Sequence, residues 1–87
     1  MTVLNGNGVS GAAAAEASRV RARGYKLGAV GNAPRGGFGQ TVVMFRPGYN
    51  GEARRLAHDL HVFLVSPLDG LRARDLHGAE LALVVGG

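Results

Sequence analysis

The chain has 87 residues and a formal net charge of +4 at neutral pH, with ten basic residues and six acidic ones. It contains no cysteine, so disulfide frameworks and thiolate zinc sites are excluded. No apolar run approaches the roughly 20 residues of a membrane-spanning helix. We therefore expect one small domain. Its basic surface favours anionic partners such as nucleic acid, lipid headgroups or phosphate-bearing polymers, unless the charge only keeps the domain soluble.

A glycine-rich turn follows the first apolar residues. Val3 and Leu4 lead into three glycines with the spacing G-x-G-x-x-G, at Gly6, Gly8 and Gly11. This pattern predicts a strand, a tight turn and the start of a helix. We expect Gly6 and Gly8 to adopt positive φ angles or to approach another group closely, and Gly11 to let the helix pack tightly on the strand.

Residues 10–23 are predicted to form the first helix. Ser10 is a suitable N-cap because its hydroxyl can accept a hydrogen bond from the first helical turn. Gly24 follows at the position where a glycine commonly ends a helix. The face that we expect to be buried consists of apolar residues at helical spacing, namely Val9, Ala13, Ala17 and Val20.

The rest of the chain predicts four more strands and a second helix. The strands are expected at residues 25–30, 41–46, 62–65 and 81–85, with breaks at 31–34 and 66–67. The second helix is expected from about Gly51 to Leu60, with Asn50 as its N-cap. Its buried stripe consists of Ala53, Leu56, Ala57 and Leu60. Residues 68–78 hold Leu71 and Leu76 among charges, in an irregular loop or a short helical turn.

The predicted order of elements, βαββαββ, favours an α+β fold. We expect a two-layer sandwich in which both helices cover one face of a mixed sheet of four to five strands. The strand at 41–46 is almost continuously apolar, which predicts an interior position. Right-handed crossovers would place the first strand beside the strands that follow the helices.

Three interpretations of the glycine turn are open: a dinucleotide fingerprint, another anion contact, or a purely structural corner. The fingerprint needs an acidic residue about 20 positions on, but no acidic residue lies between Glu16 and Glu52. No Lys-Ser or Lys-Thr pair follows the glycines, so a Walker loop is excluded. A structural corner is favoured, and anion binding at the helix N-terminus is the functional alternative.

Other motifs give little support for chemistry. The three histidines, His58, His61 and His77, lack the convergent ligands of a metal site, so we predict no metal and no cofactor. No serine lies in a nucleophile elbow and carboxylate pairs are sparse, so we predict no enzymatic activity. The segment Arg35-Gly36-Gly37-Phe38-Gly39 is similar to an RNA-binding arginine–glycine box, although a single copy between two strands is more typical of a hairpin loop.

Several segments together resemble the LytR C-terminal domain family, a module of LytR–CpsA–Psr cell-envelope proteins. They are residues 3–13, Gly24-Tyr25, Gly31-Asn32-Ala33, Thr41-Val42-Val43, Arg46-Pro47-Gly48-Tyr49, Ala53, Arg55-Leu56-Ala57 and 79–86. The resemblance covers nearly the whole chain. The glycine-rich loop at 35–39 and the basic stretch at 71–75 depart from it.

The resemblance implies one domain over residues 1–87, cut from a longer membrane-anchored protein and held outside the cytoplasmic membrane by a tether elsewhere in that protein. It implies an accessory role in wall assembly. Expected partners are a cell-envelope protein, such as a LytR–CpsA–Psr phosphotransferase domain, or an anionic wall polymer. The catalytic residues of that phosphotransferase belong to a different domain and are not transferred to this chain.

We therefore predict a non-catalytic binding module, with a small basic nucleic-acid-binding domain as the alternative. The candidate ligand-binding residues are Asn5, Gly6, Asn7, Gly8, Ser10, Gly11, Arg46 and Tyr49. The competing interpretation is that Asn5 and Asn7 only stabilise the turn through side-chain-to-backbone hydrogen bonds. In that case Tyr49 packs at the edge of the core and Arg46 faces solvent.

Overall fold

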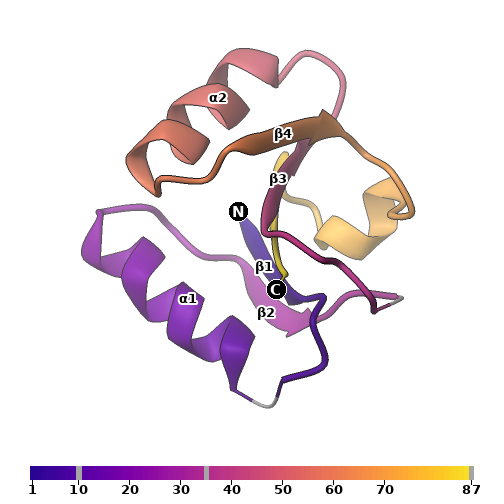
Figure 1. The fold of residues 1–87 in the computed structure, drawn as a ribbon. Helices are drawn as coiled ribbons and strands as arrows, with labels where there is room; N and C mark the ends of the chain where they lie inside the picture. The colour runs from indigo at the N-terminus through magenta and orange to yellow at the C-terminus, as the bar shows by residue number, and fades with distance from the viewer. Residues whose placement is uncertain (10, 35, 87) are drawn as a thin grey trace.

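The structure is a computed structural model that describes residues 1–9, 11–34 and 36–86 (Figure 1). The predicted N-cap residue Ser10 lies outside the described residues. In chain order the elements are β1 (Thr2–Asn5), α1 (Ala12–Ala22), β2 (Ala29–Asn32), β3 (Val42–Phe45), α2 (Asn50–Asp59), β4 (Leu64–Pro67), the short 3-10 helix η1 (Ala73–Leu76) and β5 (Leu81–Val85).

The five strands form one mixed sheet in the order β2-β1-β5-β3-β4. β1 is parallel to both β2 and β5, β3 is parallel to β4, and β3 and β5 are antiparallel. The prediction of a mixed sheet is confirmed, as is the interior position of β3. The first strand lies beside β2, as expected, but β4 lies on the far side of β3, so the second half of the crossover prediction is wrong.

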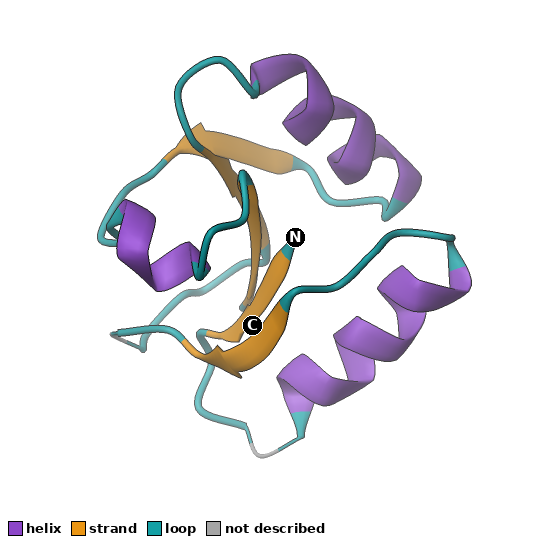
Figure 2. Cartoon of the chain, turned by 180° about the vertical axis from the view of Figure 1, so that it is seen from behind, coloured by secondary structure: helices purple, strands orange, loops and turns teal. Residues whose placement is uncertain are grey.

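Both helices lie on the same side of the sheet and η1 lies on the other, as Figures 1 and 2 show. The core on the helix side joins sheet residues such as Val43 and Leu83 to the buried faces of α1 and α2. The predicted stripe of α2 is buried in full: Ala53, Leu56, Ala57 and Leu60. In α1, Ala13, Ala17 and Val20 are buried, but Val9 precedes the helix and is exposed, which corrects that part of the prediction.

A second core lies on the opposite face of the sheet. Leu71 and Leu76 pack there against Leu4, Met44 and Val84. The hydroxyl of Thr2, itself buried, donates to the carbonyl oxygen of Leu76 at 2.6 Å and fixes η1 to the first strand. The charged segment around Leu71 and Leu76 therefore covers this face of the sheet. Its apolar side chains form a second, thinner part of the core.

Both helices end in Schellman motifs, in which the C′ residue adopts a left-handed conformation. In α1 this residue is Gly24, at φ 87°, as predicted, and the amide of Tyr25 reaches the carbonyl oxygen of Val20. In α2 it is His61, at φ 56°, and the amide of Val62 donates to the carbonyl oxygen of Ala57 at 2.8 Å.

These helix ends explain two errors in the predicted strands. β2 begins at Ala29 rather than Tyr25, because the chain leaving α1 must first return to the start of β1, where Gly28 donates to the carbonyl oxygen of Met1. β4 begins at Leu64 rather than Val62, because Val62 is used in the end of α2. As a result, Gly31-Asn32 and Ser66-Pro67, predicted as breaks, lie within strands.

The second helix also begins differently from the prediction. Its N-cap position is Tyr49, and Asn50 is already helical. No side-chain hydrogen bond caps the first turn of α2, and Glu52 in that turn complements the helix dipole instead.

Candidate functional site

The glycine turn is held together by the side chain of Asn5. Its Oδ1 accepts hydrogen bonds from the backbone amides of Asn7 (3.1 Å) and Gly8 (3.2 Å), and its Nδ2 donates to the carbonyl oxygen of Val9 at 2.7 Å. One amide side chain therefore bonds three backbone groups of the turn, of which the carbonyl oxygen of Val9 also accepts from the amide of Ala12 at the start of α1.

Asn7 adds two further bonds to this network. Its Oδ1 accepts from the amide of Val9 at 2.8 Å, and its Nδ2 donates to the carbonyl oxygen of Gly86 at 3.4 Å. The amide of Gly6 donates to the carbonyl oxygen of Val85. The amides of residues 6–9 are thus already engaged, so an anion bound there would have to displace these partners. These hydrogen bonds agree with the interpretation in which Asn5 and Asn7 stabilise the turn.

The three glycines of the turn have different roles. A Cβ on Gly6 would lie 2.7 Å from the Phe38 ring and 2.7 Å from the Val84 side chain. The close approach of these two side chains to the backbone therefore requires glycine at position 6. Gly8 and Gly11 have φ angles of 75° and 82° and open space around the Cβ position. The expectation that Gly11 allows close packing of the helix on the strand is therefore wrong. Gly11 serves as the left-handed N-cap of α1.

The structure does not bring Arg46 and Tyr49 to the glycine turn. Asn5 lies beside Val85 at one end of β5, whereas Phe45 lies opposite Leu81 at the other end. The two groups are separated by the length of β5, about 13 Å. Arg46 and Tyr49 instead form the link into α2, where the amide of Tyr49 donates to the carbonyl oxygen of Arg46. The predicted set of site residues therefore does not form one site.

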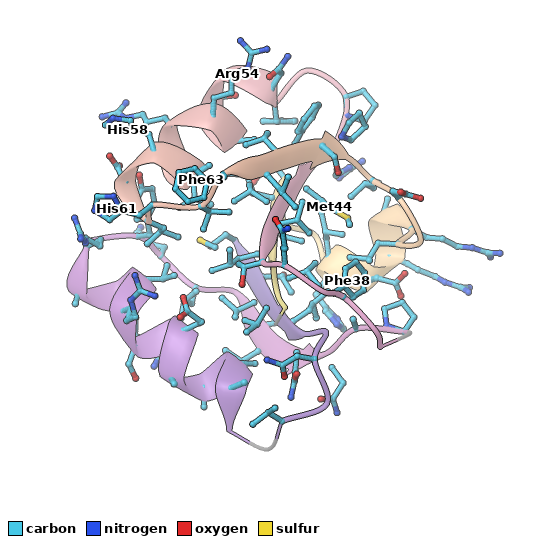
Figure 3. The ribbon with its side chains drawn as sticks, viewed as in Figure 1. Phe38, Met44, Arg54, His58, His61 and Phe63 are labelled. Atoms are coloured by element: carbon cyan, nitrogen blue, oxygen red, sulfur yellow. The ribbon has the colours of Figure 1, made fainter. Side chains whose placement is uncertain are left out.

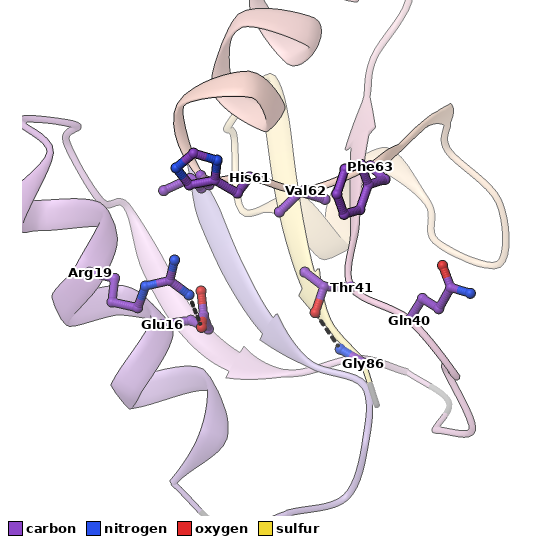
Figure 4. A pocket seen from close by; sticks show the side chains of 9 residues that line it. Glu16, Arg19, Gln40, Thr41, His61, Val62, Phe63 and Gly86 are labelled. Carbon is purple, nitrogen blue, oxygen red and sulfur yellow. Dashed lines mark hydrogen bonds and ion pairs between the residues drawn. The ribbon is translucent and has the colours of Figure 1, made fainter.

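A pocket of about 430 Å³ lies next to the glycine turn, between α1 and the link from α2 to β4 (Figure 4). Its volume is within the range of about 300–1,000 Å³ that small-molecule sites occupy. The residues that line it come from four parts of the chain: Glu16, Arg19, Gln40, Thr41, Leu60, His61, Val62, Phe63 and Gly86. Sequence reasoning identified none of these nine residues as part of a site.

Polar groups line one side of the pocket and an exposed aromatic ring lines the other. Glu16 and Arg19 form an ion pair at 2.7 Å on α1. The hydroxyl of Thr41 accepts a hydrogen bond from the amide of Gly86 at 3.1 Å, which links the pocket to the glycine turn. Across from the ion pair, Phe63 is 94% exposed (Figure 4).

A polar contact joins the end of α1 to the end of α2. Tyr25, just after α1, donates a hydrogen bond from its hydroxyl to Oδ2 of Asp59 at the end of α2. This hydrogen bond is the main reason that the pKa of Tyr25 lies above its ordinary value of 10.0. The same bond lowers the pKa of the Asp59 carboxyl below 3.8, and His58 and Arg55 act in the same direction. The pair is a structural clamp between the helices.

The part of the chain that is described holds neither a cluster of metal-ligating side chains nor a helix that could span a membrane. Residues 1–9, 11–34 and 36–86 hold no group of three His, Asp or Glu side chains that could surround a metal ion. Within the same ranges, no helix combines the length and the apolar character needed to cross a bilayer.

The family model described as "LytR cell envelope-related transcriptional attenuator", LytR_C, matches residues 1–87, the whole chain. The chain belongs to the LytR_C family. LytR_C is a family of C-terminal accessory domains in the cell envelope and is not a known catalytic family. The family resemblance identified from the sequence is therefore confirmed.

Among solved structures, this LytR_C domain is similar to the "Solution Structure of the C-terminal domain of RV0431". The two share 29% identity with a TM-score of 0.53, and the match covers 99% of this chain and 70% of the other. No curated protein sequence matches the chain. The likeness supports the α+β sandwich, and it assigns no role to any residue of the pocket.

Proposed function

We propose that this LytR_C domain is a non-catalytic binding module that acts outside the cytoplasmic membrane in the assembly of wall glycopolymers. It contacts a partner protein or a wall polymer, and a tether elsewhere in a longer protein holds it at the membrane. Family membership supports the envelope context. The observation that carries the binding role is the pocket beside the glycine turn, which combines hydrogen-bonding side chains with an exposed aromatic ring.

The arrangement in this pocket suits recognition better than catalysis. The Glu16 carboxylate is neutralised by Arg19, and the Thr41 oxygen accepts a hydrogen bond from the backbone of Gly86. Neither group is therefore paired as base and nucleophile, the arrangement that covalent catalysis uses. Gln40 supplies a donor and an acceptor at the opening, and Phe63 supplies a flat apolar surface, as in many small-molecule sites.

Amide chemical-shift mapping of the whole domain tests this proposal. Soluble peptidoglycan fragments and a glycerol-phosphate polymer serve as the wall probes, and co-purification with a LytR–CpsA–Psr phosphotransferase domain tests the protein partner. We expect shifts at Thr41, Phe63 and Gly86 with a wall probe, weakened by Gln40→Ala and unaffected by Tyr49→Ala. No shift up to millimolar probe, together with no co-purification, would overturn the proposal, as would turnover of a probe.

The nucleic-acid alternative receives less support from the structure. Phe38, the only aromatic residue of the loop at 35–39, is half-buried and packs against the core on the η1 side of the sheet. Its ring is thus engaged in the fold, whereas single-stranded nucleic acid is bound by stacking bases on exposed rings. Titration with single-stranded RNA serves as the comparison, and steeply salt-dependent shifts over residues 36–39 would favour the alternative.

A further inference from the structure

The β4 edge of the sheet is open. Among the residues that the structure describes, β4 is the last strand of the sheet and β3 is its only strand neighbour. Natural proteins usually protect such an edge with charged residues, bulges or proline, because its free N–H and C=O groups can pair with another chain. The four residues of β4, Leu-Val-Ser-Pro, include no charge, and only Pro67 at the far end limits pairing.

Two large apolar side chains are exposed where this strand begins. Phe63 is 94% exposed and Leu64 is 43% exposed. Because neighbouring side chains of a strand point to opposite faces, Phe63 lies on the helix side with Val65, and Leu64 lies on the η1 side. Leu64 lines a groove of about 510 Å³ together with Val42, Met44 and Phe38. Figure 3 labels Met44 and Phe38.

The flank of α2 that faces this edge carries an exposed arginine. On the other flank, Asp59 is bonded to Tyr25 and its Oδ1 lies 3.8 Å from Nδ1 of His58, so that side of the helix faces α1. Arg54 is exposed on the opposite flank. Figure 3 shows Arg54 on the outer side of α2. The η1 side differs in charge, because Asp69 lines the groove there.

We propose that the β4 edge binds an extended segment of a partner protein as an added strand. Apolar side chains of that segment cover Leu64 and the groove, and an acidic side chain on the other face pairs with Arg54. Strand addition of this kind takes its affinity from backbone hydrogen bonds and its specificity from alternate side chains. This inference rests on the proposed binding function and commits it to a protein partner at the β4 edge, which adjoins the pocket at Phe63 and Gln40.

Synthetic octapeptides with blocked ends provide the probes. The first alternates valine and glutamate, so that one face is apolar and the other is acidic. The second replaces glutamate with lysine, and the third has the composition of the first in the order Val-Val-Glu-Glu, which destroys the alternation. We expect the first peptide to shift and protect the amides of residues 63–66 at 0.15 M salt. The third peptide has the same charge and tests whether the strand pattern is needed.

Variants of the domain then test the two parts of the surface. Leu64→Ser is expected to weaken binding of the valine–glutamate peptide by about tenfold. Val30→Ser on the β2 edge is the matched control, because Val30 is 43% exposed, like Leu64. Arg54→Glu is expected to weaken the same peptide by about fivefold and to favour the lysine peptide. Arg21→Glu on α1 makes the same change in net charge. It should neither weaken binding of the valine–glutamate peptide nor favour the lysine peptide.

Several results would overturn the proposal. Equal binding of the alternating and the non-alternating acidic peptides would mean that only net charge is recognised. Self-association that Phe63→Ser abolishes, without peptide binding, would identify a second copy as the occupant, and Phe63-dependent binding to anionic vesicles alone would identify a lipid surface. If the peptides fail while wall fragments or the phosphotransferase domain still bind, the β4 proposal falls and the proposed function stands.

Discussion

Gly86 crosses Gln40 so closely that the two residues have no room for a side chain between them. A Cβ on Gly86 would overlap the carbonyl group of Gln40 and would lie 2.8 Å from its backbone nitrogen. Gly86 also donates to Thr41 and accepts from Asn7, so the end of β5 holds together the pocket, the glycine turn and the start of β3.

Gly86→Ala is therefore expected to destabilise the domain by about 1–3 kcal/mol, since backbone must move to admit the methyl group. Urea unfolding followed by circular dichroism measures the effect. Gly39→Ala is the matched control, because its Cβ position has no neighbour within 4 Å, and its free energy of unfolding should change by less than about 0.5 kcal/mol. Equal effects of the two substitutions would contradict the close approach.

Asn5→Ala is expected to cost about 1–3 kcal/mol, because it removes the acceptor of two backbone amides of the turn and one of the two donors to the carbonyl oxygen of Val9. Asn5→Asp keeps the acceptor for Asn7 and Gly8 and loses only the donor to Val9, so it should cost less. Thermal unfolding of both variants gives the comparison. If alanine and aspartate proved equally harmful, the hydrogen bonds to Oδ1 would not be what stabilises the turn.

Substitutions at the ends of the two helices are expected to change the stability of the domain in opposite directions. His61 adopts a left-handed conformation that costs a non-glycine residue about 1 kcal/mol, so His61→Gly should stabilise the domain by up to that amount. Gly24→Ala at the equivalent position of α1 should destabilise it by a similar amount. Denaturant midpoints of the two variants measure both effects, and a loss of stability in His61→Gly would be inconsistent with strain at this residue.

The sequence predicted those parts of the fold that local pattern determines. The stripe of α2, the apolar β3 and the stop at Gly24 all follow from side-chain periodicity or from the conformational freedom of glycine. The starts of β2 and β4 do not, because each depends on how many residues the preceding helix end uses. Val62 is apolar and β-branched, so it is typical of a strand, yet its amide is needed to close α2.

The site was harder to predict than the fold, because its residues meet only through strand direction and sheet order. The sequence analysis groups Arg46 with the glycine turn, but β3 and β5 are antiparallel, so the end of β3 lies at the opposite end of the sheet from Asn5. Glu16, Gln40 and Gly86 converge on one pocket from distant parts of the chain. No spacing in the sequence indicates such a meeting.

The Tyr25–Asp59 clamp predicts a pH-dependent contribution to stability. The folded-state pKa of Asp59 is lowered, so its contribution is present above the unfolded value of 3.8 and is lost as pH falls through the folded value. The pKa of Tyr25 is raised, so its contribution is present below 10.0 and is lost as pH rises through the folded value. The stability difference between wild type and Tyr25→Phe should therefore be largest near neutral pH.

We expect this difference to decrease at both acid and alkaline pH, because the bond needs a protonated hydroxyl and an ionised carboxylate. Urea unfolding of the two proteins from pH 3 to pH 11 measures it. Tyr49→Phe is the control, since it removes the same hydroxyl from an exposed tyrosine. A Tyr25→Phe difference that stays constant across the range would mean that the hydroxyl and the carboxylate do not interact in the folded domain.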